Sequence, residues 1–128
     1  MTYLTLLLAF KIVVTALMVS LPFVFLPAKH LQARFNLGAE ALPLARLYGI
    51  AVTALLVGYG GGIAPAQAGV FPWGVVAMGI FSNLGATIGL FVTGAWRRSV
   101  AAPIIFGGIA VALVFAALLP SVALTRAF

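Results

Sequence analysis

The side chains that could carry chemistry in this chain are few. Its 128 residues include a single histidine, His30, a single carboxylate, Glu40, and neither Asp nor Cys. Paired carboxylates for acid–base catalysis, a Ser-His-Asp triad and a Cys-His pair are therefore excluded. His30 and Glu40 together would be two ligands short of the usual four of a zinc site. We expect no catalytic residue, no metal and no cofactor, and we do not expect an enzyme.

Three polar residues lie near the middle of long apolar runs. Thr53 and Asn83 lie at the centres of the second and third runs, and Thr15 lies within two residues of the centre of the first. In a membrane these side chains would share one depth and could hydrogen-bond between helices. Two interpretations stay open. These side chains could serve only to hydrogen-bond helices together, or they could form a substrate or ion site, since transporters bind their substrates near the midplane.

A second group of residues is expected at the headgroup level. Arg46 lies about one turn inside its apolar run, deeper than a simple anchor requires. It could pair with Glu40 or with helix carbonyls, or it could hold an anionic headgroup or the polar head of a ligand. The residues predicted to form this ligand or headgroup site are Arg46, Tyr48, Trp96, Arg97 and Arg98.

Lys11 lies about one turn inside the first apolar run. Its long apolar stem would allow the ammonium to snorkel back to the outer headgroups. A functional cation inside the membrane would need an acidic partner, and Glu40 is predicted to lie at the opposite face. We therefore expect Lys11 to be an anchor.

The composition places these residues in a membrane. The chain is 65% apolar and 6% charged, whereas a soluble domain is about 45–50% apolar and about 25% charged. This excludes a soluble monomer, a disordered chain and a nucleic-acid binder, despite the net charge of +6. A spanning helix needs about 20 apolar residues. We expect one all-α transmembrane domain over 1–128, a four-helix bundle with spans at about 6–26, 43–63, 72–95 and 103–119.

Proline and glycine mark the ends of these spans. Pro43, Pro72 and Pro103 each stand where a helix can begin, because first-turn N–H groups have no helical acceptor. The run Gly60-Gly61-Gly62 is predicted to end the second span. Pro22 lies inside the first span and is predicted to kink it near Met18.

The basic residues predict an orientation. Lys29, Arg34 and Arg46 lie in or beside the connection of the first two spans, and Arg97 and Arg98 lie in that of the last two. Since Lys and Arg concentrate in cytoplasmic loops, we expect both connections to be cytoplasmic and both termini to lie outside the inner (plasma) membrane. The segment 28–42 is typical of a short amphipathic helix, or of a solvated loop, near anionic lipid headgroups.

Small residues recur four apart on three of the spans. Such stripes let helix backbones approach closely in lipid. The third span carries small residues on more than one face, which indicates contact with another protein or with a second copy of the chain. The residues predicted to pack helices are Ala54, Gly58, Gly62, Gly85, Gly89, Gly108 and Ala112. The similarity of Gly49–Val57 to Gly108–Ala116 also allows two similar helical hairpins.

Four short spans, a basic connection and the motif Arg46-Leu47-Tyr48-Gly49 at the start of the second span resemble the DoxX-like superfamily of small bacterial membrane proteins. The pattern of spans and connections is similar over most of the length, whereas the sequence motif covers only a handful of residues. It implies a four-helix bundle and the character of a subunit, since some relatives are membrane subunits of quinone-linked oxidoreductases.

Two functions are compatible with these features. The first is a non-catalytic accessory or assembly subunit that packs on a larger membrane complex, which the resemblance suggests is quinone-linked and electron-transferring. The alternative is a small carrier or lipid- or quinone-binding protein, with its ligand between the level of Asn83 and the arginines near Arg46. The partners expected are anionic lipids and other membrane subunits or further copies of the chain, and no nucleic acid.

Overall fold

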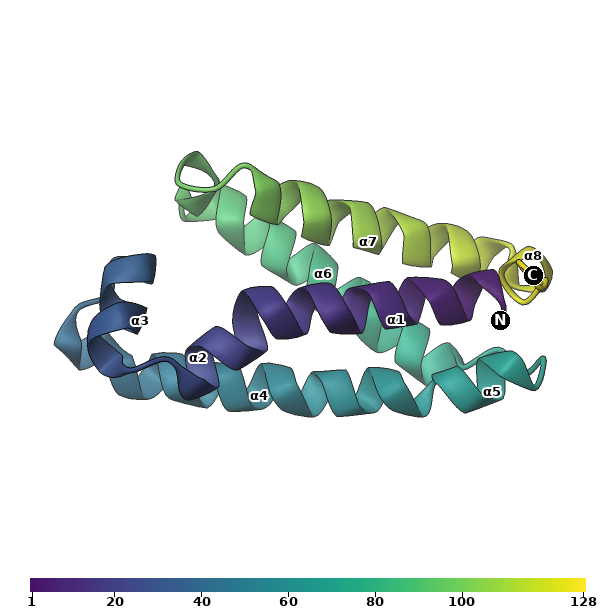
Figure 1. The fold of residues 1–128 in the computed structure, drawn as a ribbon. Helices are drawn as coiled ribbons and strands as arrows, with labels where there is room; N and C mark the ends of the chain where they lie inside the picture. Colours follow the sequence, from purple (N-terminus) through teal and green to yellow (C-terminus); the bar gives the residue numbers. More distant parts are fainter.

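Four rods of helix make up the structure, a computed structural model that describes residues 1–128 (Figure 1). The first rod is α1 (Tyr3–Thr15), the π-helical turn η1 (Ala16–Ser20) and α2 (Leu21–Phe25); the second is α4 (Leu42–Gly61) followed by α5 (Ile63–Gln67); the third is α6 (Trp73–Val92); and the fourth is α7 (Ala101–Leu118). The shorter elements are α3 (Ala28–Phe35), η2 (Ala39–Ala41), η3 (Ala95–Arg97) and α8 (Pro120–Ala123). There is no strand, and all four rods are long and apolar enough to span a membrane. The predicted all-α four-helix bundle is confirmed.

The first rod contains the irregularity predicted from Pro22. The helix widens into η1, where the amide of Leu21 bonds to the carbonyl of Ala16, five residues back. Pro22 follows near the start of α2. Proline has no N–H to donate, but the wide hydrogen bond of η1 is donated by Leu21 and is therefore kept. Figure 1 shows α2 displaced from the line of α1 toward α4. Pro22 therefore redirects the rod without ending it.

The second rod extends further than predicted. Gly60-Gly61-Gly62 does not end it, because the chain turns back into helix as α5, and Gly62 keeps a right-handed helical conformation with φ −81°. The helix α5 ends at Gln67, and the first glycine with positive φ is Gly69. α4 itself ends at Gly61, within the predicted glycine run, but the rod continues in helix to Gln67, beyond the predicted limit at residue 63.

The termini hold one end of the bundle closed. Thr2 and Arg126 form an antiparallel β-bridge. The amide of Tyr3 bonds to the carbonyl of Thr125 at 3.2 Å, and the amide of Ala127 bonds to the carbonyl of Met1 at 2.9 Å. Figure 1 shows both termini and α5 at this end, with α3 and the α6–α7 connection at the other. We call the end with α3 and the α6–α7 connection the basic end, because it carries both basic connections.

The rods pair differently at the two ends. α6 packs along α7, and near the termini it also lies against α4, where Gly58 faces the side chain of Met78. Toward the basic end α6 and α7 diverge from α2 and α4 (Figure 1). The hairpin of the first two rods also contains η1, α2 and α3, which have no counterpart in the hairpin of the last two rods. The two hairpins therefore share a direction but differ in local structure.

The segment after α2 contains the amphipathic helix predicted from the sequence. In α3 the side chain of Leu31 is fully buried, whereas Lys29 and Arg34 are exposed. The helix ends at Asn36 in the left-handed conformation, with φ 52°, which a short amide side chain tolerates. The helical part covers only the first half of the predicted segment, and η2 and a loop make up the rest.

Only some of the predicted small residues pack helices inside the chain. A Cβ on Gly62 would lie 2.9 Å from Val75, and Gly58 also faces α6. In contrast, a Cβ on Gly85, Gly89 or Gly108 would meet no atom within 4 Å. Ala54 is exposed and Ala112 is half-buried. Gly85, Gly89 and Gly108 therefore pack against no other helix of this chain, because periodicity identifies a small stripe without telling which way it faces.

Two glycines outside the predicted stripes allow the closest approaches. A Cβ on Gly79 would lie 2.6 Å from Leu113 of α7 and 3.1 Å from the ring of Tyr59. A Cβ on Gly49 would lie 2.7 Å from Cβ of Phe23 in α2. Gly79 therefore brings three spans together at mid-depth.

The fold predicts a simple sidedness, which cysteine labelling can measure because the chain has no native cysteine. Cysteines at Lys29 and Arg97 should react with an impermeant maleimide from one side of sealed vesicles. Cysteines at Gln67 and Arg126 should react only from the other side. Opposite accessibility of positions 29 and 97 would contradict the arrangement of the four spans.

Candidate functional site

Lys11 is buried in the interior of the bundle. Its side chain is 4% exposed, and its Nζ donates a hydrogen bond of 2.8 Å to Oδ1 of Asn83 in α6. Nζ also lies 4.6 Å from the centroid of the Tyr59 ring in α4, within the range of a cation–π interaction. The predicted snorkelling to the outer headgroups is therefore wrong. Lys11 joins three spans.

The reason lies in the helical face that carries Lys11. Leu4, Leu8, Lys11 and Thr15 are all buried, and their spacing of four, three and four places them on one face of α1. Since Leu4 and Leu8 are core residues, Lys11 must point into the core as well. This spacing was visible in the sequence and would have identified Lys11 as an interior residue.

The other polar side chains around Lys11 bond to one another. Nδ2 of Asn83 donates to the carbonyl of Gly79 at 2.6 Å, which leaves Oδ1 facing the ammonium. The hydroxyls of Tyr59 and Ser82 are 2.6 Å apart, and Ser82 donates to the same Gly79 carbonyl at 3.3 Å. The amide and both hydroxyls are therefore satisfied inside the chain.

No acid balances the charge of Lys11. The single carboxylate, Glu40, lies in η2 at the basic end and is exposed. Burying an ammonium ion costs several kcal/mol even after the surroundings relax. A neutral acceptor and an aromatic face recover part of that cost. A buried ionisable residue within a membrane span marks a candidate functional site.

A small cavity lies beside the ammonium. Its volume is about 50 Å³, and its polar lining comes from Lys11, Thr15, Tyr59, Ser82 and Asn83, together with Tyr48. The hydroxyl of Thr15 is buried and has no hydrogen-bond partner. An unsatisfied polar group in a membrane interior costs free energy. The residue that carries this unpaired hydroxyl and the one that carries the charged donor line the same cavity.

The predicted polar level is divided between two places. Asn83 and Thr15 line the cavity. Thr53 lies elsewhere, where its hydroxyl is 2.5 Å from that of Ser20 and donates to the carbonyl of Gly49 at 2.8 Å. The three side chains do not hydrogen-bond to one another. Asn83 and Thr15 were predicted from their depth in the sequence, but their neighbours Lys11, Tyr59 and Ser82 were missed.

Arg46 is engaged by the backbone of α2. Its guanidinium donates to the carbonyls of Phe23 at 2.8 Å, Val24 at 3.0 Å and Leu26 at 2.5 Å. These carbonyls are free because the helix ends before Pro27, and a cation at a helix C-terminus is favourable. Of the two roles considered for Arg46, the structure shows the pairing with helix carbonyls, and Arg46 makes no ion pair with Glu40.

The remaining predicted headgroup residues do not converge on one site. Trp96 packs near Phe91, with ring centroids 5.9 Å apart, and Arg97 lies over Trp96 at 5.6 Å. Tyr48 packs edge-on against Phe23 at 5.6 Å. Only Arg98 lines the large opening at the basic end, and the second arginine there is Arg34.

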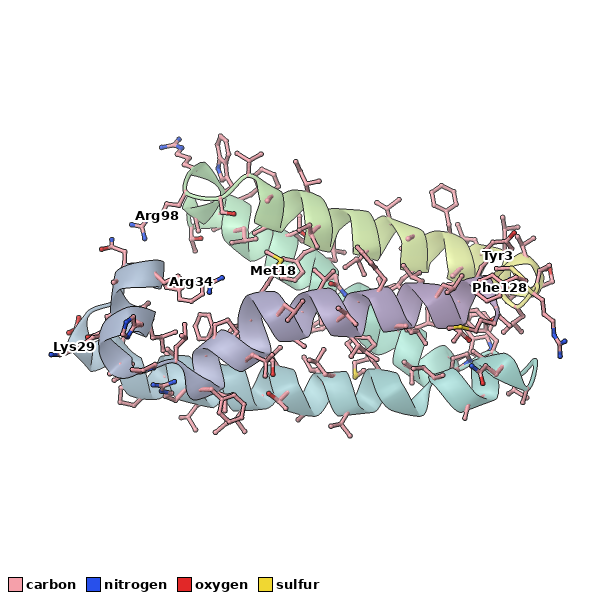
Figure 2. The ribbon with its side chains drawn as sticks, viewed as in Figure 1. Tyr3, Met18, Lys29, Arg34, Arg98 and Phe128 are labelled. Carbon is pink, nitrogen blue, oxygen red and sulfur yellow. The ribbon has the colours of Figure 1, made fainter.

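That opening is a groove of about 440 Å³ between α3 and the α6–α7 connection. Its charged and polar lining residues are Arg34, Asn36, Arg98 and Ser99, and its apolar ones include Met18, Leu90, Ala102 and Phe106. Figure 2 shows Arg34 and Arg98 on opposite sides of the opening and Met18 deeper between the rods. The groove thus has a basic mouth and an apolar interior, the two properties of a site for an anionic amphiphile.

The groove and the small cavity adjoin. Val19 of η1 and Phe106 of α7 line both of them.

Comparison with known protein families, curated proteins and solved structures gave no match. Functional assignment therefore rests on these two spaces and their side chains.

The Lys11–Asn83 bond predicts a non-additive effect on stability. Asn83→Leu alone should lower the free energy of unfolding by about 1.5–3 kcal/mol, because it leaves a buried charged donor without its acceptor. Adding Lys11→Met should recover much of that loss. Unfolding in detergent of the wild type, both single variants and the double variant measures this. Additive effects would contradict a coupled pair.

Proposed function

We propose that this chain is a multi-pass membrane protein that binds an amphiphilic ligand of the lipid or quinone class and carries out no chemistry on it. The observation that carries the proposal is the groove of about 440 Å³, whose mouth has two arginines and whose interior is apolar. Small-molecule sites have volumes of about 300–1,000 Å³ with a few polar groups that fix orientation. The single carboxylate and single histidine argue against catalysis.

The charge at the mouth favours an anionic or strongly polar head. Arg34 and Arg98 come from α3 and from the α6–α7 connection, so a ligand between them would bridge the two parts of the bundle that diverge there. No acidic residue lines the groove. Guanidinium groups bind carboxylate and phosphate oxygens in bidentate geometry, while Met18, Val19 and Phe106 would contact the tail.

The orientation of the chain completes the proposal. Since basic residues concentrate on cytoplasmic loops, the basic end would face the cytoplasm and the termini would lie outside the plasma membrane. The groove would then open at the leaflet that is rich in anionic lipids, where each nearby Lys or Arg contributes about 1 kcal/mol of attraction.

Adjacent arginines provide a matched test. Arg98 lines the groove, whereas its neighbour Arg97 lies over Trp96 outside it. Arg98→Gln should lower the amount of anionic lipid that stays bound in native mass spectrometry by about tenfold, from the loss of one charge-assisted contact. Arg97→Gln, which removes the same charge, should have little effect.

A second pair of variants tests the apolar part of the groove. Ala102→Trp would fill the groove, and Ala101→Trp places the same side chain at an exposed position next to it. Only the first should displace bound lipid. Equal lipid retention by all four variants would contradict the proposal.

A second candidate is the accessory subunit. Gly85 and Gly89 on α6 and Gly108 on α7 are exposed, and a methyl group added at any of them would have no neighbour within 4 Å. Glycines on a lipid-facing surface give helices from another chain room for close approach. This surface supports a role as a subunit of a larger membrane complex, which the DoxX-like resemblance would make quinone-linked.

Gly85→Leu tests the subunit role. If a partner packs there, the variant should keep the thermal stability of the isolated chain but lose co-migration with a larger complex after mild extraction. Ala51→Leu, which enlarges an exposed small residue on α4, should leave co-migration unchanged. Migration of the wild type as a monomer alone would contradict this candidate.

A further inference from the structure

The cavity beside Lys11 presents hydrogen-bond donors that the chain itself does not use. An ammonium has three N–H groups, and one of them bonds to Asn83. The hydroxyl of Thr15, one turn further along α1, has no partner. Both side chains line the same cavity and both are at least nine-tenths buried, with exposed fractions of 4% and 5%.

The neighbouring acceptors are already engaged. The carbonyl of Gly79 accepts from Asn83 and from Ser82, and the hydroxyls of Tyr59 and Ser82 bond to each other. The rest of the lining is mainly aliphatic and aromatic, from Val19, Val52, Leu55, Leu56 and Phe106 among others. The cavity therefore offers a charge and two donors among mainly apolar side chains.

We propose that this cavity binds a halide-sized monovalent anion such as chloride, held by Nζ of Lys11 and Oγ1 of Thr15. The volume of about 50 Å³ suits one ion of about the size of a water molecule, whose share of the liquid is about 30 Å³. A halide accepts from both donors and also cancels the ammonium charge, which a water molecule cannot do. The anion therefore balances the charge of Lys11, next to which the protein has no carboxylate.

The same geometry gives the anion a way in. Val19 and Phe106 separate the cavity from the groove, and the mouth of the groove carries Arg34 and Arg98. Positive charge around a low-dielectric opening raises the local concentration of anions. The ion therefore enters from the basic end. The anion site is separate from the proposed amphiphile site, because it depends on Lys11 and Thr15 and not on the two arginines.

Thermal unfolding of the purified, delipidated protein in detergent tests the proposal. Chloride replaces gluconate at constant ionic strength, and the midpoint is recorded at each concentration. We expect a saturable rise in Tm with chloride and with bromide, because a ligand that binds only the folded state stabilises it. A crystal grown in bromide should show anomalous density within hydrogen-bonding distance of Nζ of Lys11.

Thr15→Val is the informative variant, because valine has nearly the same shape and leaves no unpaired hydroxyl. In gluconate it should be at least as stable as the wild type, since it removes a buried unsatisfied group. In chloride it should be less stable, and its apparent Kd for chloride should be about tenfold weaker or more. Lys11→Met should abolish the chloride response, and Arg97→Gln should retain it.

Three outcomes would overturn the proposal. One is a wild-type Tm that does not depend on chloride. Another is an unchanged chloride affinity in Thr15→Val, which also decides the matter if Lys11→Met does not fold. The third is stabilisation by octanoate and not by chloride, which would make the cavity the end of the amphiphile site. Loss of lipid binding in Arg98→Gln with an intact chloride response would leave the anion site standing.

Discussion

The burial of one ammonium group constrains much of this bundle. Lys11 can stay in the membrane interior only where it finds acceptors, and it finds them on two other spans, at Asn83 and at the face of Tyr59. The close approach of α4, α6 and α7 at Gly79 keeps those two residues in place. In lipid, where apolar contact gives no net drive for association, such polar contacts and close packing specify which helices are neighbours.

The sequence predicted the number of spans, their approximate limits and the common end of the basic connections, because length, hydropathy and charge are properties of each segment alone. It did not predict which faces meet. Gly85 and Gly89 formed the clearer stripe but face outward, whereas Gly79 makes the closest approach. Periodicity defines a face, and only the neighbouring helices decide whether that face is inside.

The site was predicted in part for the same reason. Asn83 could be singled out because an amide at mid-span is costly without a partner. Lys11 was placed at the headgroups because it lies near the start of its run, although its spacing from Leu4 and Leu8 puts it on the core face. Arg46 was predicted either to pair with helix carbonyls or to hold a ligand, and only the structure shows that the carbonyls at the end of α2 engage it. Arg34, predicted only as a basic residue of the first connection, is the one that lines the groove.

The π-helical turn η1 connects the two candidate sites. Met18 and Val19 within it line the groove, and Val19 together with Thr15, immediately before the turn, lines the cavity. The widened turn and Pro22 direct α2 toward α4, away from the α6–α7 connection, and so the bundle stays open at the basic end. Turns of this kind cost regular hydrogen bonding and are frequent at functional sites. Replacing η1 by a regular helix would change the direction of α2 and the positions of Met18 and Val19 together. The groove and the cavity beside Lys11 therefore depend on the same local distortion.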